Sequence, residues 1–201
     1  MCPGEWVSDE VITYYFQLLR LRDRKLVSLG RKSRYNHYFN SFFFSKLGTG
    51  PSYSYGSVKR WSKKVEGKDV FNLDKIIVPV NVSNMHWCLL CVHVQERNIQ
   101  YYDSLGGPGT EYLEAMRRYL SDEWSAKGKP GDFDERPWTL TPTTPETPRQ
   151  RNGYDCGVFT SMCADYLSLG LELRYDQDDI KKCRRRMALK ILKGAEGLDL
   201  D

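Results

Sequence analysis

The sequence predicts an α+β fold with a central sheet flanked by helices. First, three apolar, strand-like runs are grouped in the middle of the chain, at about 75–81, 87–94 and 99–103. Second, the segments with helical periodicity come before and after this group. Third, the turn at 95–98 is short enough to join the last two runs as an antiparallel hairpin.

The first half of the chain begins with a helix predicted at about 8–22. An aromatic-rich region at about 38–63 follows and is expected to hold one short helix. The first strand, at about 75–81, contains Pro79. Proline cannot donate a ladder hydrogen bond, so this residue indicates a sheet edge or a bulge.

The second half of the chain is predicted to be mainly helical. A helix at about 110–126 has these large apolar side chains on one face: Tyr112, Leu113, Met116, Tyr119, Leu120 and Trp124. An irregular segment at 127–148 is expected to lead to an amphipathic helix that begins near Cys156. The apolar face of that helix comprises Val158, Phe159, Met162, Cys163, Tyr166 and Leu167. A final helix is predicted at about 177–193.

Length and composition predict one domain over residues 1–201, with a helical part at about 1–70 and the sheet and later helices at about 71–201. The first residues lack a signal-peptide pattern, and no stretch approaches the roughly 18 apolar residues of a membrane span. Six cysteines in a chain of this length do not make a disulfide scaffold. We therefore expect no membrane association and a reducing compartment, nuclear and/or cytoplasmic.

The chain is mildly basic, with a net charge of +4. Several of its basic residues lie on the final predicted helix, where an apolar stripe comprises Ile180, Cys183, Met187 and Ile191. Most of these charges are therefore expected to form the solvated face of that helix, which argues against nucleic acid binding. The mildly basic net charge fits the attraction of an acidic protein partner better. We expect a monomer.

The segment from Gln150 to Gly157 is the most informative in the chain. Turn-forming residues precede Cys156, and Asp155 is expected to cap the helix that follows. Cys156 would then lie in the first helical turn, where free backbone N–H groups and the helix dipole favour a thiolate. Although a free cysteine often only fills space, this context indicates a nucleophile.

A cysteine nucleophile needs a base, and the chain has three histidines. His86 stands at the mouth of a core strand, from which it can project toward a helix terminus. His93 lies within the same strand and is expected to be a partly buried packing residue. His37 lies in a polar, aromatic segment where a surface or hydrogen-bonding role is expected. We therefore assign the base to His86.

The orienting acid follows from the predicted hairpin. In an antiparallel hairpin the start of the first strand lies beside the end of the second. His86 stands at the start of the first strand and Asp103 at the end of the second, so the two would lie close together. Cys156, His86 and Asp103 then form a triad in which each group orients or activates the next. Gln150, shortly before the cysteine on the same loop, can donate to the oxyanion that forms in acyl transfer.

Two cysteines, Cys88 and Cys91, lie close together on a predicted strand. Their spacing points the two side chains to opposite faces, which argues against both a zinc site and a redox dithiol. We therefore expect no metal site and no cofactor.

Three motifs occur in a specific order: His-Trp at 86–87, Tyr-Asp-Ser at 102–104 and Gln-x-Asn-Gly-x-Asp-Cys-Gly at 150–157. At these residues the sequence resembles the SUMO-specific (sentrin-specific, Ulp-type) cysteine proteases. Further matching segments lie at 6–9, 39–44, 75–80, 101–107 and 185–187. The resemblance covers about 6–192 and implies a single catalytic protease domain. It also implies a papain-like α+β fold whose central sheet is mixed or antiparallel and flanked by helices.

By resemblance, Cys156, His86 and Asp103 are the triad and Gln150 is the oxyanion donor. The resemblance also implies a narrow tunnel for a Gly-Gly tail, with Trp6 and Trp87 as walls. The surface that receives the modifier would comprise Asp9, Asn40, Phe42, Ser45, Asn81 and Asn84. The sequence departs from the family at Arg149, where a glutamine is usual, and in the long Thr/Pro-rich stretch before it. These departures affect the path of the loop.

The leading hypothesis is a protease that cleaves after the Gly-Gly terminus of SUMO, in the precursor and in lysine isopeptides. Its partners would be SUMO and SUMO-conjugated proteins. The alternatives are a deconjugase of a Nedd-type modifier, an acetyltransferase with a similar triad, and a modifier-binding module without turnover. Trp87 favours a peptide tunnel over an acetyl-CoA site, and the intact triad argues against a binding module.

Overall fold

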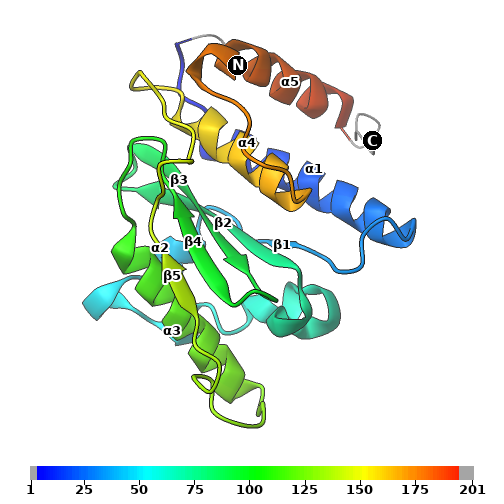
Figure 1. The fold of residues 1–201 in the computed structure, drawn as a ribbon, viewed down its shortest axis with the longest axis vertical. Helices are drawn as coiled ribbons and strands as arrows, with labels where there is room; N and C mark the ends of the chain where they lie inside the picture. The colour runs from blue at the N-terminus through cyan, green and yellow to red at the C-terminus, as the bar shows by residue number, and fades with distance from the viewer. Residues whose placement is uncertain (1–3, 195–201) are drawn as a thin grey trace.

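The computed structural model describes residues 4–194 (Figure 1). Within this range the strands form one mixed sheet in the order β1-β2-β3-β4-β5. The strands are β1 (His37–Tyr38), β2 (Lys75–Val82), β3 (His86–His93), β4 (Asn98–Tyr102) and β5 (Thr139–Thr141). The two outer pairs, β1 with β2 and β4 with β5, are parallel, and the central three strands are antiparallel. The predicted α+β class with a mixed sheet is confirmed.

The hairpin of β3 and β4 has the predicted pairing. Leu89 lies opposite Tyr102 in the register, so Asp103 follows directly at the end of β4 that lies beside the start of β3. The pairing of β1 with β2 ends at Tyr38, which lies opposite Ile77. Pro79 lies in β2 beyond this paired part. At Pro79 the strand is therefore a local sheet edge, as the sequence predicted, and no ladder hydrogen bond is lost there.

Helices cover both faces of the sheet (Figure 1). The α-helices are α1 (Asp9–Ser28), α2 (Phe43–Leu47), α3 (Thr110–Ala126), α4 (Cys156–Ser168) and α5 (Ile180–Lys193). Short 3₁₀ segments lie at Gly50–Ser52, Tyr55–Ser57, Trp61–Lys64, Glu66–Lys68, Val70–Asn72 and Gln177–Asp179. Helices α1, α4 and α5 lie on one side of the sheet, and α2 and α3 on the other.

The alternation of side chains along the strands creates two cores. Leu90 and Val92 face α2 and α3, where they join a cluster with Phe43 and Tyr119. Leu89 and its neighbours on the other face join the core beneath α1, α4 and α5. Helix α1 packs against α4, and β1 pairs with β2. The first 70 residues therefore contribute to both cores and to the sheet.

Three predictions about individual elements differ from the structure. Helix α4 is not amphipathic, because Tyr166 is its one side chain that is not classed as buried. The sheet, α1 and α5 surround it, so the polar positions between its apolar residues are buried as well. The segment at 127–148 is not wholly irregular, because β5 pairs with β4 there. Helix α1 also continues six residues beyond its predicted end.

A buried ionic cluster joins the helices on the α4 side of the sheet. Asp165 of α4 pairs with Arg22 of α1 and, at 3.1 Å, with Lys190 of α5. Tyr15 donates to the same carboxylate at 2.8 Å. Burial opposes the charge on Asp165, but the attraction of Arg22 and Lys190 outweighs it and lowers the pKa of the carboxyl group.

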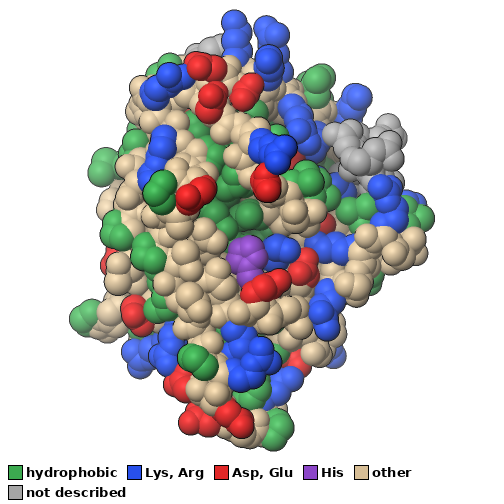
Figure 2. Space-filling model, viewed as in Figure 1, with side chains coloured by type: hydrophobic (Ala, Val, Ile, Leu, Met, Phe, Trp, Pro, Cys, Tyr) green, Lys and Arg blue, Asp and Glu red, His purple; other side chains and the backbone are tan. Residues whose placement is uncertain are grey.

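The basic residues of α5 do not all face solvent. Lys181, Lys182 and Arg185 are exposed, as predicted, but Arg184 and Lys190 are buried in ion pairs. Figure 2 shows basic side chains toward the upper and right part of the molecule, where α5 lies, with acidic side chains among them. No described helix is both long enough and apolar enough to cross a membrane.

Candidate active site

Cys156 is the first residue of α4 and is buried, with 3% exposure. The backbone N–H groups of Trp87 and Gly157 lie beside its thiol and help to lower its pKa. Glycine at position 157 allows close packing here, because a Cβ would lie only 2.9 Å from Cβ of Val7, although its 3.5 Å distance from the ring of Trp87 would be an ordinary contact. The helix start is therefore pressed against β3, with the thiol beside the strand that carries His86.

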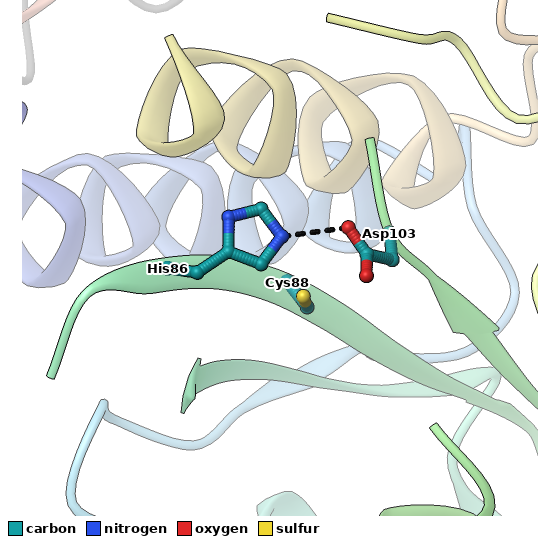
Figure 3. A group of neighbouring side chains, drawn as sticks. All are labelled: His86, Cys88 and Asp103. Carbon is teal, nitrogen blue, oxygen red and sulfur yellow. Dashed lines mark hydrogen bonds and ion pairs between the residues drawn. The ribbon is translucent and has the colours of Figure 1, made fainter. Parts of the chain in front are cut away.

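His86 is the first residue of β3 and is half-buried. Its Nε2 lies 2.6 Å from Oδ1 of Asp103 (Figure 3). Its other ring nitrogen, Nδ1, points toward α4, and the imidazole interacts with the thiol of Cys156. The imidazole therefore lies between the acid and the thiol, and its contact with Asp103 is the one that the hairpin predicted.

Asp103 follows β4 and is held from several sides. Its carboxylate accepts from the N–H of Leu105 at 2.7 Å and from the N–H of Gly107 at 2.9 Å. Burial disfavours the carboxylate, but His86 and these two donors outweigh burial and lower the pKa of Asp103. The acid is thus ionised and fixed in orientation at neutral pH.

The thiol and the imidazole shift each other's pKa in opposite directions. Burial disfavours the thiolate, yet the hydrogen bond from His86 and those from the backbone lower the pKa of Cys156. Burial also disfavours the imidazolium, yet Asp103 and Cys156 raise the pKa of His86 well above its ordinary value. Both shifts favour a thiolate–imidazolium pair, which is the reactive form of a cysteine nucleophile.

The side chain of Gln150 is fixed by two hydrogen bonds. Its Oε1 accepts from the hydroxyl of Ser104 at 2.6 Å, and its Nε2 donates to the carbonyl of Asn152 at 2.5 Å. A carbonyl oxygen only accepts, so the amide nitrogen must be the atom that faces Asn152. The second N–H of this amide has no partner among the described residues and is free to donate to a bound group.

A pocket of about 780 Å³ lies between the start of α1, the α2 region and the loop between β2 and β3. Seven of the eight residues predicted to bind the modifier line it: Trp6, Asp9, Phe42, Ser45, Asn81, Asn84 and Trp87. Trp6 and Phe42 are exposed by 57% and 55%, which indicates a surface for a partner. Oδ1 of Asn81 is buried and has no hydrogen-bond partner, so it is available to a ligand.

Comparison of the chain with known proteins shows the family to which it belongs. The model of the Ulp1 protease family, C-terminal catalytic domain, matches residues 5–195. The chain belongs to the Ulp1 protease family. It is 38% identical over 192 residues to ubiquitin-like-specific protease 1A of Arabidopsis thaliana, and 35% identical over 188 residues to human sentrin-specific protease 2. These alignments cover 94% and 93% of this chain, but 37% and 30% of the relatives. The chain therefore spans about a third of their length.

The fold of this Ulp1-family chain is also similar to solved structures. One is the C-terminal Ulp1 protease domain in complex with Smt3, the yeast orthologue of SUMO, with a TM-score of 0.77 and 28% identity. The match covers 98% of this chain and 80% of that one. Another is the SUMO protease Ulp1 with its catalytic cysteine oxidised to a sulfonic acid, with the same TM-score and identity over 98% and 82% of the two chains.

Asn40 is the predicted modifier-binding residue that lies outside the main pocket. It lines a neighbouring pocket of about 390 Å³, together with residues of α1 and β1. Its Oδ1 accepts from the N–H of Phe42 at 3.0 Å. This bond fixes the start of the turn that presents Phe42 to the main pocket.

The loop that leads to Cys156 in this Ulp1-family domain departs from one prediction. Asp155 does not cap α4 through its side chain. Its carboxylate instead accepts from Arg184 at 2.6 Å, from Asn152 at 2.6 Å and from Gln177 at 2.9 Å. The residue therefore ties the loop to α5 and to the 3₁₀ segment before it, because the buried guanidinium of Arg184 competes successfully for the carboxylate.

The remaining histidines are removed from the triad. The prediction of a surface role for His37 is wrong, since it is 4% exposed and burial lowers its pKa to about 4. His93 is partly buried, as predicted, and burial lowers its pKa as well. Neither histidine interacts with Cys156, whose pKa responds to His86 alone among the histidines.

Sequence reasoning missed two residues that shape the site. Ser104 orients the amide of Gln150, and Arg149 donates to the backbone carbonyl of Asp103 at 3.0 Å. Ser104 stands next to Asp103 in the Tyr-Asp-Ser motif, which is a signal that could have found it. The resemblance implied glutamine at this position, so the bond from Arg149 to the loop of Asp103 could not be expected from it.

Proposed function

We propose that this domain is a thiol protease that cleaves after the C-terminal Gly-Gly of SUMO. It would process the SUMO precursor and remove SUMO from lysine side chains. The observation that carries the proposal is the position of Trp87. Trp87 lines the 780 Å³ pocket, and its backbone N–H contacts the thiol of Cys156. A chain end bound along the pocket would thus reach the nucleophile.

In the proposed acylation step, the thiolate of Cys156 attacks the carbonyl carbon of the terminal glycine. The carbonyl electron pair moves onto oxygen, and the oxyanion is met by two donors. One is the free N–H of Gln150, and the other is the backbone N–H of Cys156 in the first turn of α4, where N–H groups lack helical partners. The bond to the leaving amine then breaks to form a thioester.

His86 moves the protons in both steps. As imidazolium it gives its proton to the leaving amine, which departs as a free lysine side chain or a new N-terminus. The neutral imidazole then takes a proton from water, and the hydroxide attacks the thioester carbon. The thiolate leaves and the pair with His86 is restored. Asp103 stays ionised throughout and keeps Nε2 of the imidazole in place.

Several observations support SUMO as the modifier. The chain is similar to sentrin-specific proteases and to an Ulp1 domain solved in complex with Smt3. The pocket combines exposed aromatic side chains with Asp9, Asn81 and Asn84, whose polar groups can select among modifiers with the same tail. We propose Asn40 as a further part of this surface, and SUMO and its conjugates as the partners of a single, monomeric catalytic domain.

The proposal is tested by cleavage of fusions that differ only in the modifier. We expect kcat/KM for a SUMO fusion to exceed that for a matched Nedd-type fusion at least tenfold, which corresponds to about 1.4 kcal/mol. A Cys156→Ala protein serves as the background control for both substrates. Equal rates, or faster cleavage of the Nedd-type fusion, would contradict the SUMO assignment and leave the triad in place.

We propose a nuclear and/or cytoplasmic location. The nucleophile requires a reduced thiol, and the five cysteines within the described residues are all free. Imaging of the tagged full-length protein tests this, since accumulation in an oxidising compartment would contradict it.

A further inference from the structure

Cys88 lies beside the triad but takes no part in the proposed mechanism. Its sulfur, an imidazole nitrogen of His86 and a carboxylate oxygen of Asp103 all lie within 4.8 Å of one another (Figure 3). Cys88 is 1% exposed and Asp103 is 6% exposed, while His86 is half-buried. One nitrogen, one sulfur and one oxygen donor are thus gathered at a partly accessible position.

Two regular strands bring these donors together. His86 and Cys88 are two residues apart at the start of β3, and both lie beside Asp103 at the end of β4. The antiparallel register continues one step beyond the Leu89–Tyr102 pair, which sets Asp103 across from Cys88. Because β3 is paired along both edges, the three donors are held by a rigid frame.

We propose that His86, Cys88 and Asp103 form an inhibitory site for a thiophilic divalent cation of the zinc class. Imidazole, thiolate and carboxylate are the ligands that zinc prefers, whereas magnesium and calcium prefer oxygen alone. Metal–ligand bonds of about 2.0–2.3 Å set the donors of a tetrahedral ion roughly 3–4 Å apart. Small side-chain rotations bring the three donors to that spacing, and water takes the fourth position.

Metal binding at this site would remove the base. The ion takes the place of the proton that Nε2 of His86 shares with Asp103, and Cys88 releases its thiol proton to solvent. The imidazole then keeps a single proton, on Nδ1, which faces Cys156. It can no longer accept a proton from the nucleophile or form the imidazolium. This consequence rests on the proposed protease function, but the binding of the metal does not.

Cys88 distinguishes the proposed metal site from a second way in which an ion could bind to the triad. An ion could also bridge Cys156 and Nδ1 of His86, as any cysteine–histidine pair allows. That second mode does not use Cys88. Cys91 offers a matched control because it is a buried free cysteine of the same strand that packs in the core on the opposite face.

The binding test uses Co²⁺ as a spectroscopic probe in the Cys156→Ala protein, where the nucleophile is absent. We expect a thiolate-to-cobalt charge-transfer band that is lost on adding Cys88→Ser and kept on adding Cys91→Ser. Zinc should displace the cobalt. Absence of the band in Cys156→Ala, or its persistence after Cys88→Ser, would overturn the proposal. Cys88→Ala repeats the test if the serine variant does not fold.

The inhibition test measures zinc titrations of fusion cleavage, each normalised to the metal-free rate of the same protein. Loss of a residue that only supports a metal ligand weakens metal affinity roughly 10–100-fold, so loss of a ligand should do at least as much. We expect Cys88→Ser to raise the half-inhibiting zinc concentration at least tenfold and Cys91→Ser to leave it unchanged. Equal zinc sensitivity of the wild type and Cys88→Ser would refute the inhibitory role. If no fusion is cleaved, the proposed function fails, and the cobalt test still decides the metal site.

Discussion

At the residue scale, the site depends on how tightly each group is oriented. Asp103 receives two backbone N–H bonds and the imidazole, and its own backbone carbonyl is bound by Arg149. Gln150 is held between Ser104 and Asn152. These contacts leave few alternative positions for the reacting groups, which is the condition for electrostatic stabilisation of a transition state.

The charge of Asp103 can be tested without changing its shape. Asp103→Asn should fold normally and lower kcat by orders of magnitude, because a neutral amide can neither stabilise the imidazolium of His86 nor fix its tautomer. Circular dichroism checks the fold, and steady-state cleavage of the SUMO fusion gives kcat. Near-normal kcat would contradict the assigned role.

The thiolate of Cys156 can be detected by its reactivity at acidic pH. Iodoacetamide reacts with thiolates, so alkylation of an ordinary thiol falls as the pH drops below about 8.5. The lowered pKa of Cys156 should keep alkylation fast well below that pH. In His86→Ala the profile should move to higher pH, because the main partner of the thiolate is gone. Identical profiles for the two proteins would argue against the ion pair.

Ser104 is expected to act through Gln150. Gln150→Ala should raise the transition-state free energy by about 2.7–4 kcal/mol, the scale for losing one oxyanion donor, mainly through kcat. Ser104→Ala should lower kcat less, and Ser104→Thr, which keeps the hydroxyl, should restore much of the loss. In the double variant, Ser104→Ala should add little further loss. Additive effects in the double variant would show that Ser104 does not act through the glutamine.

All three residues of the candidate triad could be predicted because short motifs carry them. The contacts made by Ser104, Arg149 and Arg184 could not. Each joins segments that are distant in sequence, such as the 3.0 Å bond from Arg149 to the carbonyl of Asp103. The apolar stripe of the final helix predicted that most of its basic residues face solvent, whereas Arg184 forms a buried ion pair with Asp155.

At the scale of elements, the long strands and helices were predictable and the short or wholly enclosed ones were not. Helix α3 begins and ends as predicted, because one face packs on the sheet and the other meets solvent. Helix α4 is enclosed by other elements, so even Ser161 and Asp165 are buried. Strand β5 has three residues and depends on pairing with β4. Local sequence cannot report such tertiary pairing.

The ionic cluster of Asp165 should control the stability of the helices on its side of the sheet. Asp165→Asn leaves Arg22 and Lys190 buried without their counter-charge, and breaking such a pair costs about 3–5 kcal/mol. Chemical denaturation measures this change in the free energy of unfolding. The control is Asp178→Asn, which removes an ion pair with Arg151. The side chains of Arg151 and Asp178 are 63% and 81% exposed. This variant should change the free energy of unfolding by less than about 1 kcal/mol.

The same carboxylate gives stability a defined pH dependence. The pKa of Asp165 is lower in the folded protein than in the unfolded chain. Its contribution is therefore complete above the unfolded value of about 3.9 and is lost as the pH falls through the folded value. The wild type should lose more stability than Asp165→Asn over this acidic range. A parallel loss in both proteins would contradict the assigned contribution of Asp165.

At the scale of the whole molecule, the site lies where the sheet, α4 and the start of α1 meet. The strand end supplies His86, the helix start supplies Cys156, and the pocket beside them is lined by Trp6 and Asp9 at the start of α1. The proposed chemistry thus sits on rigid elements, while the proposed specificity surface extends along the start of α1 and the α2 region. Recognition and catalysis should therefore respond separately to substitution.

Asp9 tests that separation. It lies in the first turn of α1 and lines the pocket away from the thiol. Asp9→Ala should weaken cleavage of the SUMO fusion mainly through KM, because it removes a contact made equally in the ground state and the transition state. Glu10, exposed in the same turn and absent from the pocket lining, offers the matched control. A fall in kcat without a change in KM would place Asp9 in the chemistry instead.

The central claim is that Cys156 attacks the Gly-Gly end of SUMO. It is tested most directly with SUMO that carries an electrophile in place of its terminal carboxylate. We expect a covalent adduct that mass spectrometry maps to Cys156, that is absent in Cys156→Ala, and that forms faster than with Nedd-type or ubiquitin probes. An adduct at another cysteine, or no adduct with a folded protein, would contradict the account.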